Sequence, residues 1–450
     1  MLSDPRNSPL FHRDLQNPVP VIVKGEGAYL TDEDGRRYLD ASGGPAVSCL
    51  GHSHPVVIEE IKRQLDSVAY AYSMFFTTPV IEELSARLVA QAPAGLTKAF
   101  FVGSGSEAIE AAMKLARQYF LEIGQPSRTR FIARERSYHG NTLGALALGG
   151  DANRRAPYQP LLIDVTHIAP CYEYRDRQPG ESAEQYGIRV ADELERAIER
   201  LGPENVAAFF CEPVVGASLG AAPPVPGYLK RLREICDRHG VLLVFDEVMC
   251  GMGRTGHMFA CAEDGVAPDI LTMAKGLGGG YQPVGGLMVS QRIFDAIADG
   301  SGNLRHGQTY AGHTLAIAAA LGVQKAIAEE GLLARVRHLG QRLMTQLQER
   351  FGQHPNVGDI RGRGLFIGLE LVADRDSKAC FDPAAKLWQR VRRLGFEESL
   401  ICYPTGGCVD GSRGDTVILA PPFVLTDGQT DEIVEKLSRT LDRAVLAAKP

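Results

Sequence analysis

The chain has 450 residues, a net charge of −6 and an ordinary composition of 44% hydrophobic and 23% charged residues, so its length predicts about two or three domains. It has no basic block to neutralise phosphates, no apolar run of roughly 18 residues and no apolar signal core, which argues against nucleic-acid binding, a membrane span and secretion. Its nine cysteines include no CxxC pair, so we expect reduced thiols, no metal site and a cytoplasmic location.

The N-terminal segment, residues 1–59, begins as a loop and then alternates polar and apolar residues. Two alternating runs within 19–41 are joined by the turn formers Asp34 and Gly35, and they predict two short strands. Helical periodicity follows over 55–69 and returns over 78–93.

From about residue 97 to 300 the sequence repeats strand, turn and helix. The apolar runs in 206–213 and 241–248 are short and continuous, as in strands buried on both faces, and a helix is predicted between them at 227–240. This βαβ pattern predicts a mostly parallel sheet with helices on both faces.

After about residue 315 the repeating strand-turn-helix pattern stops, which indicates the end of this sheet region. A long helical stretch over 315–351 precedes a smaller α+β unit. We therefore expect a large domain over 60–325 and a small C-terminal domain over 326–450. The strands of residues 1–59 are expected to join the small domain.

A glycine-serine turn, Gly103 to Ser106, lies between a predicted strand and a predicted helix. The first amides of a helix lack internal partners and carry partial positive charge, so such a turn can bind a phosphate. A plain helix N-cap, with Glu107 in the first turn, is an equal alternative. The turn is neither a Walker loop nor a GxGxxG motif.

Two further strand ends carry polar or aromatic side chains. Tyr138, in "SYHG", could stack its ring on a flat ligand, and ordinary core packing is the alternative. Asp246 and Glu247 end an apolar run, where a partly desolvated carboxylate prefers a cationic partner. A helix or turn cap is the alternative for these two carboxylates.

Lys275 ends another apolar run and opens the loop "GLGGGYQPVGG". An amine in a partly apolar cleft has a lowered pKa, and the neutral amine can attack a carbonyl to form a Schiff base. The glycines that follow would let the backbone approach a ligand closely. The alternative is a surface lysine whose charged end reaches solvent.

Together, these residues predict pyridoxal 5′-phosphate as the cofactor. This cofactor needs a lysine for its aldehyde, an anion site for its phosphate and a carboxylate for its pyridinium nitrogen, and it benefits from packing against a flat ring. Lys275, the turn at Gly103–Ser106, Asp246 and Tyr138 offer these four features, each at a predicted strand end.

The chain resembles the class III pyridoxal-phosphate aminotransferases of fold type I, often called omega-transaminases. The motifs that carry the resemblance span nearly the whole chain in order: "LGHSHP", "GSGSEAIEAAMKLAR", "SYHG", "CEPVVG", "VFDEVMCGMGRTG", "AKGLGGGYQPVGG", "HGQTYAGH" and "APPFVLT". The resemblance implies an α/β fold. Its large domain would hold a mostly parallel, seven-stranded sheet flanked by helices, and a smaller α+β domain would be built from both chain ends.

The resemblance also implies roles at matching positions. Lys275 would form the Schiff base with the cofactor and shuttle the proton, while Asp246 would keep the pyridinium nitrogen protonated. Tyr138 and Val248 would pack on the two faces of the ring. Thr309 would reach the phosphate of a neighbouring subunit, which implies a homodimer and leaves tetramers open. The cofactor-binding set is completed by Ser104, Gly105, Ser106, His139 and Glu212.

Two positions bear on the choice of substrate. Family members that bind a second carboxylate often carry a glutamate shortly after the "EP" pair and an arginine two places before "APP". This chain has Ala217 and Ile418 there, which weighs against ornithine-, acetylornithine- and 4-aminobutyrate-type enzymes. Arg413 could form a bidentate pair with the carboxylate of a 2-oxo acid, and a solvated loop arginine is the alternative.

Four further residues are expected near the substrate. Phe75 and Phe76 fall where the family places aromatics in the substrate pocket or at the dimer contact, and core packing is an equal alternative. Pro45 and Ala46 stand where some amine transaminases carry a tryptophan, so the pocket is expected to be wider there.

The resemblance thus implies a transaminase with a ping-pong mechanism. The donor would be an amine or an omega- or beta-amino acid, and the acceptor a 2-oxo acid, pyruvate in first place. An aminomutase or a decarboxylating transaminase of the same fold is the alternative, and a non-catalytic cofactor-binding protein is a third.

Overall fold

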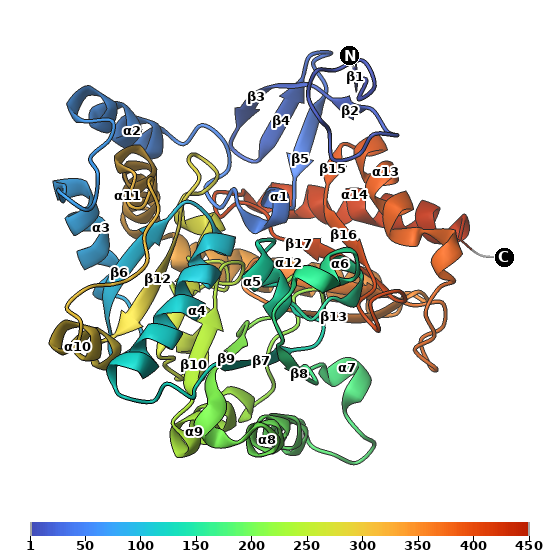
Figure 1. Ribbon diagram of the computed structural model, residues 1–450. Helices are drawn as coiled ribbons and strands as arrows, with labels where there is room; N and C mark the ends of the chain where they lie inside the picture. The colour runs from blue at the N-terminus through green and yellow to red at the C-terminus, as the bar shows by residue number, and fades with distance from the viewer. Residues whose placement is uncertain (1, 449–450) are drawn as a thin grey trace.

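A seven-stranded sheet forms the centre of the computed structural model, which describes residues 2–448 (Figure 1). Its strand order is β6-β12-β11-β10-β9-β7-β8, and only β12 runs antiparallel to its neighbours. The mostly parallel sheet expected from the sequence is therefore confirmed. The strands are β6 (Leu96–Val102), β7 (Arg130–Arg134), β8 (Thr166–Ile168), β9 (Val206–Cys211), β10 (Leu242–Asp246), β11 (Ile270–Met273) and β12 (Gly285–Ser290).

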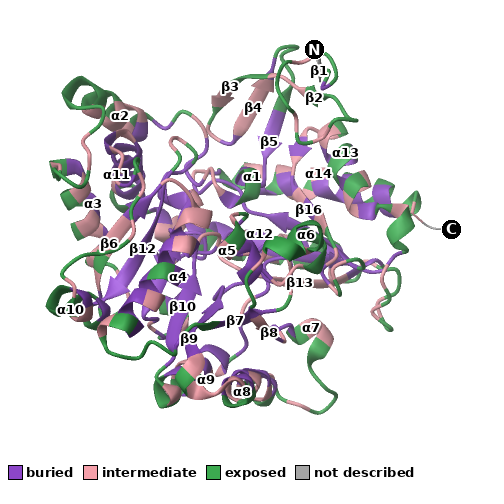
Figure 2. Ribbon diagram, viewed as in Figure 1, coloured by how far each residue is buried: buried purple, intermediate pink, exposed green. Residues whose placement is uncertain are grey.

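Helices cover both faces of this sheet because successive strand residues point to opposite sides. Phe210 and Val244 pack in one apolar cluster with the long helix α4 (Gly105–Glu122). Phe209 and Leu243 pack in another cluster, with α8 (Ala183–Leu201) and α9 (Tyr228–His239). Every residue of β9 and β10 is buried, and Figure 2 shows these strands in the buried colour.

Two smaller sheets are built from the chain ends, and the second of them combines both ends. One has the order β13-β14-β17-β16, and the other has the order β15-β5-β4-β3. In the second sheet β15 runs parallel to β5, with Leu400 opposite Leu39. The strands are β3 (Ile22–Glu26), β4 (Tyr29–Asp32), β5 (Arg37–Asp40), β13 (Val357–Arg363), β14 (Phe366–Leu371), β15 (Leu400–Ile401), β16 (Tyr403–Gly406) and β17 (Asp415–Leu419); a short pair, β1 (Leu2–Ser3) and β2 (Val19–Pro20), lies apart.

The remaining helices lie around these sheets (Figure 1). Helix α11 packs against α2 and α3, while α12 and α13 both pack against α14. Within residues 2–448, no helix combines the length and apolarity needed to cross a membrane. The helices are α1 (Gly43–Ala46), α2 (Pro55–Ser67), α3 (Pro79–Val89), α5 (Leu143–Leu148), α6 (Ala152–Arg155), α7 (Glu173–Asp176), α10 (Gln291–Asp299), α11 (Thr314–Glu329), α12 (Leu332–Phe351), α13 (Leu387–Glu397) and α14 (Asp427–Leu446).

The predicted domain boundaries, 59/60 and 325/326, fall inside α2 and α11. These two helices pack closely on each other. We therefore propose that the larger unit includes both helices whole, from residue 55 to 329, and that residues 19–41 belong with the C-terminal unit.

Candidate active site

A cavity of about 610 Å³ opens where the strands of the large sheet end. Asp246 is the last residue of β10, and Lys275 follows β11 by two residues. Because parallel strands share one carboxyl edge, their end residues meet there. The opposite wall comes from the residues after β5 and from β16. The cavity also contains the following residues expected from the sequence: Pro45, Ser104, Gly105, Ser106, Tyr138, His139, Glu212, Ala217 and Val248.

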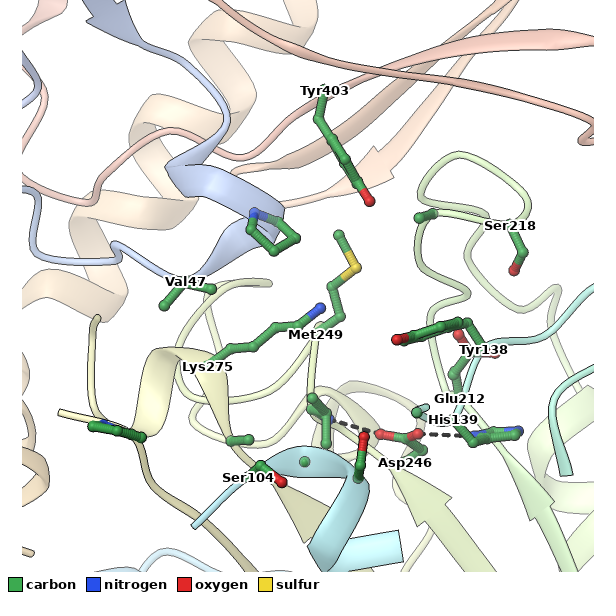
Figure 3. A pocket seen from close by; sticks show the side chains of 18 of the residues that line it. Val47, Ser104, Tyr138, His139, Glu212, Ser218, Asp246, Met249, Lys275 and Tyr403 are labelled. Atoms are coloured by element: carbon green, nitrogen blue, oxygen red, sulfur yellow. Dashed lines mark hydrogen bonds and ion pairs between the residues drawn. The ribbon is translucent and has the colours of Figure 1, made fainter. Parts of the chain in front are cut away.

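Asp246 is buried and held by three donors, of which Figure 3 labels His139. Its Oδ2 accepts a hydrogen bond from Nδ1 of His139 at 2.8 Å. Its Oδ1 accepts from the backbone N–H of Val248 at 3.0 Å and from the Thr272 hydroxyl at 3.3 Å. This set fixes the carboxylate in one orientation, in which it can attract a cationic group.

The neighbouring Glu247 points elsewhere, although the sequence gives both carboxylates the same context. Its carboxylate is fully buried and accepts from the backbone N–H groups of Ala260 and Cys261, at 2.6 and 2.8 Å. The adjacent residues of a strand end face opposite sides, so Asp246 faces the cavity and Glu247 caps a turn. Of the two interpretations offered for these carboxylates, the helix or turn cap is therefore the one that applies to Glu247.

Two buried polar atoms near Asp246 lack hydrogen-bond partners among the described residues: Nε2 of His139 and Oε2 of Glu212. Arg134 donates from Nη2 to the Glu212 carbonyl at 2.6 Å, and this Nη2 lies 3.6 Å from Oε2. Burial raises the pKa of Glu212. A buried polar atom without a partner is costly, so these two atoms leave unused hydrogen-bonding capacity next to Asp246.

Lys275 is the amine of this cavity. Its side chain extends into the space bordered by Met249, Tyr138 and Tyr403 (Figure 3). Its backbone has a left-handed φ of 47°, which is unfavourable for a residue with a Cβ. Burial lowers the pKa of Lys275 to about 8, against the attraction of Asp246 and Glu212. About a tenth of this amine is therefore neutral at pH 7, far more than for an ordinary lysine, and the neutral form can act as a nucleophile.

This lowered pKa predicts the pH dependence of cofactor attachment. Only the neutral amine attacks an aldehyde, so the attachment rate of pyridoxal 5′-phosphate to apoprotein should rise with pH and level off above about pH 8. Stopped-flow absorbance of the lysine-linked cofactor between about pH 6 and 10 measures this midpoint. A midpoint near the ordinary lysine value of about 10.4 would contradict the assignment.

The glycine-serine turn begins helix α4 at Gly105. The Ser104 hydroxyl accepts from the Glu107 N–H, and the Glu107 carboxylate accepts from the Gly103 N–H, at 3.2 and 2.6 Å. The N-cap interpretation of Ser104 is thus correct. It does not exclude an anion site, because Gly105 and Ser106 also line the cavity at the positive end of the helix.

Gly105 is required by close packing. A Cβ at this position would lie 2.9 Å from Cγ1 of Val248 and 3.5 Å from Cβ of Ala274. We expect Gly105→Ala to destabilise the apoprotein by about 1–3 kcal/mol through overpacking, measured by thermal unfolding. Adding Val248→Ala should recover most of the loss. Wild-type stability in the single variant, or no recovery in the double variant, would argue against this contact.

Tyr138 follows β7 and is half-buried at the cavity wall. The guanidinium carbon of Arg154 lies 5.0 Å from the centre of its ring. The core-packing alternative does not describe Tyr138, since the ring borders the cavity.

Some residues predicted near the substrate lie outside the cavity. Arg413 is largely exposed and its Nε donates to Asp410 at 2.6 Å, so contact with a substrate would need a movement of this loop. Ala46 is turned away from the cavity into a small apolar cluster that includes Ile418, because its φ of 63° and the kink before it redirect the side chain. Its neighbours Pro45 and Val47 face the cavity instead, which corrects the expectation for Ala46.

Thr309, Phe75 and Phe76 are also outside the cavity, on the protein surface. The two phenylalanines are 71% and 66% exposed, so the core-packing alternative is wrong for them. The Tyr70 hydroxyl donates to the Thr309 carbonyl at 2.7 Å, which brings this loop beside the segment that carries Phe75 and Phe76.

Arg154, Met249 and Tyr403 are among the cavity-wall residues that were not anticipated. Arg154 had a local signal, because Asp151 begins a short helix three residues before it. Tyr403 had none, since its position depends on the pairing of β16 with β17 across the small domain.

The fold and cavity define a class of protein: an α/β enzyme with a lysine and a buried aspartate at the carboxyl edge of its sheet. A family model for class-III aminotransferases matches residues 11–441, and the chain belongs to this family of pyridoxal-phosphate-dependent enzymes. An uncharacterized aminotransferase of Schizosaccharomyces pombe is 45% identical over 97% of this chain and 96% of that protein. The adenosylmethionine-8-amino-7-oxononanoate aminotransferase of Nitratidesulfovibrio vulgaris is 39% identical, over 97% and 79%.

Solved structures give the same result. The omega transaminase of Pseudomonas jessenii, solved in complex with PMP, has a TM-score of 0.92 and 32% identity, and the match covers 99% of this chain and 98% of that one. An (S)-enantioselective omega-transaminase of Thermomicrobium roseum has a TM-score of 0.91 and 33% identity, with 98% and 96% covered. The fold type I prediction is therefore confirmed.

Proposed function

We propose that this aminotransferase moves an amino group from an amine or an omega- or beta-amino acid to a 2-oxo acid. Pyruvate is the first candidate for this acceptor. The proposal also places pyridoxal 5′-phosphate in the 610 Å³ cavity, and the transfer proceeds in two half-reactions. The observation that carries it is the convergence of Lys275, the Asp246–His139 pair and the Gly105–Ser106 turn on this one cavity.

The residues present fit this cofactor. Lys275 offers an amine with a lowered pKa, and Asp246 offers a fixed carboxylate. Gly105 has no room for a Cβ, and Oε2 of Glu212 lacks a partner among the described residues. When bound, pyridoxal 5′-phosphate supplies an aldehyde that condenses with amines and a ring that accepts an electron pair.

The residues of the cavity then have separate roles in the reaction. Nζ of Lys275 takes a proton from the substrate carbon and returns it, because its pKa near 8 suits a general base and acid near neutral pH. The Asp246 carboxylate would keep the ring nitrogen of the bound cofactor protonated by its negative charge. Tyr138 and Val248 would pack on the ring, and Ser106 and Gly105 would bind the phosphate at the start of α4.

The proposal includes a homodimer. Met74, Phe75 and Phe76 are 74%, 71% and 66% exposed, and Tyr310 beside Thr309 is 65% exposed. The rings of Tyr70 and Tyr310 are 5.8 Å apart, so these exposed apolar side chains belong to neighbouring segments. Apolar side chains gathered on a surface mark an interface. In the dimer, Thr309 of one subunit would complete the phosphate site of the other.

Product analysis tests the reaction type. The holoenzyme would be given pyruvate with a panel of amines, beta-amino acids and omega-amino acids, and the products quantified. We expect alanine and the matching carbonyl product in equal amounts. Carbon dioxide release would favour a decarboxylating transaminase, and isomerisation without pyruvate would favour an aminomutase; either outcome as the main reaction would overturn the proposal.

A further inference from the structure

The cavity contains two arginines, Arg13 and Arg154, and Arg413 is not among its lining residues. The place where relatives that bind a second carboxylate carry a charged pair is apolar here, with Ala217 at the wall and Ile418 buried behind it. A substrate carboxylate in this cavity therefore has no cationic partner at these two positions. The two arginines that line the cavity are the candidates to bind it.

Arg154 is held in place by Asp151. The Asp151 side chain caps the short helix α6, and its Oδ1 accepts from the backbone N–H groups of Asn153 and Arg154 at 3.0 and 3.3 Å. Its Oδ2 accepts from Nε of Arg154 at 3.1 Å. One carboxylate thus positions both the backbone and the side chain of Arg154.

The terminal amino groups of Arg154 remain available. The guanidinium lies against Tyr138, with 5.0 Å between its central carbon and the ring centre, and this stacking restrains its plane. Among residues 2–448, Nη1 and Nη2 of Arg154 make no hydrogen bond to protein. The two groups form the planar pair of donors that matches a carboxylate in a bidentate contact.

The surroundings of Arg154 suit an anionic group. Tyr403 points its hydroxyl into the cavity (Figure 3). Burial raises the pKa of Tyr403, while the positive charges of Arg154 and Arg13 lower it. The hydroxyl therefore stays protonated, and it lines the same cavity as both arginines. It supplies a neutral donor in that cavity.

We propose that Arg154, positioned by Asp151 and Tyr138, binds the carboxylate of the 2-oxo acid and of amino-acid substrates. This inference rests on the proposed transaminase function and names the residue that recognises the acceptor. Arg13 and Arg154 are both exposed, but Arg13 lacks the aspartate and the ring that hold Arg154, and this makes it the weaker candidate. Arg413 is bound to Asp410 outside the cavity.

The first test compares two acceptors with one uncharged amine donor. Pyruvate carries the carboxylate, and acetaldehyde has hydrogen in its place. Arg154→Met should lower kcat/KM for pyruvate by about 10- to 100-fold, the range for losing hydrogen bonds to a charged group, and leave acetaldehyde nearly unchanged. General damage to the site would lower both equally, and that result would overturn the proposal.

Matched variants identify which arginine acts. Arg155→Met is the control, since Arg155 is on the same helical turn but contacts His167 instead of the cavity. It should keep the wild-type ratio of the two acceptors, as should Arg13→Met and Arg413→Met. A pyruvate-selective loss in Arg13→Met or Arg413→Met, with none in Arg154→Met, would also overturn the proposal.

A binding measurement separates this inference from the proposed function. Propionate has the carboxylate of pyruvate but no reactive carbonyl, and calorimetry of the holoenzyme gives its Kd. Arg154→Met should weaken propionate binding by about 10- to 100-fold, with Arg155→Met unchanged. Equal Kd values in wild type and Arg154→Met would defeat the role of Arg154. Failure of the wild type to aminate pyruvate would defeat the proposed function alone.

Discussion

Replacing Lys275 with alanine should abolish multiple-turnover transamination, with kcat lowered by at least about 10⁴-fold. The variant loses the amine whose pKa burial lowers to about 8, and with it both the covalent attachment of the cofactor and the proton transfer at the substrate carbon. General acid-base catalysis alone contributes about 10²- to 10⁴-fold. Steady-state rates and the visible absorbance of the lysine-linked cofactor measure the two losses.

The matched control for this variant is Lys230→Ala, on the exposed side of α9. It should keep wild-type turnover and the visible band. Retained multiple turnover in Lys275→Ala would show that another residue carries the proton, and the assignment of Lys275 would be wrong.

Asp246→Asn should lower kcat by about 10²- to 10³-fold, the range for removing one preorganised electrostatic contact. The amide keeps the shape of the carboxylate and its oxygen can still accept from Val248 or Thr272, so the fold should persist. It loses the negative charge that, in the proposed function, would keep the ring nitrogen of the cofactor protonated. Single-turnover rates with a saturating donor measure the chemical step.

Glu247→Gln is the control for this charge change. Glu247 is equally buried and is adjacent in sequence, but its carboxylate caps a turn outside the cavity. Burial raises its pKa to about 7, so the neutral amide replaces a group that is already partly protonated near neutral pH. We expect nearly wild-type single-turnover rates. Equal losses in the two variants, or an unchanged rate in Asp246→Asn, would contradict the role of Asp246.

The sequence predicted well which residues would meet at the cavity, because that arrangement depends on a few strong rules. Asp246, Tyr138 and Lys275 each follow an apolar run, and the carboxyl ends of such strands meet at one edge of a sheet. The glycine-serine turn was placed correctly for the same reason. The resemblance to a family then assigned individual roles to these positions.

The substrate side was harder to predict because it depends on the local conformation of loops. The kink before Ala46 sends its side chain into an apolar cluster, and Pro45 and Val47 take the cavity wall. The bond from Arg413 to Asp410 holds that arginine in its own loop. Such φ values and short-range ion pairs cannot be predicted from the pattern of apolar residues in the sequence.

A half-reaction titration tests the central claim most directly. The holoenzyme is mixed with an accepted donor in the absence of any acceptor, and the cofactor spectrum and carbonyl product are followed. We expect one equivalent of carbonyl product per site while the lysine-linked band disappears, and pyruvate should then restore the band and yield one equivalent of alanine. Continued product formation without pyruvate, or a band that the donor leaves unchanged for every donor tested, would contradict transamination at Lys275.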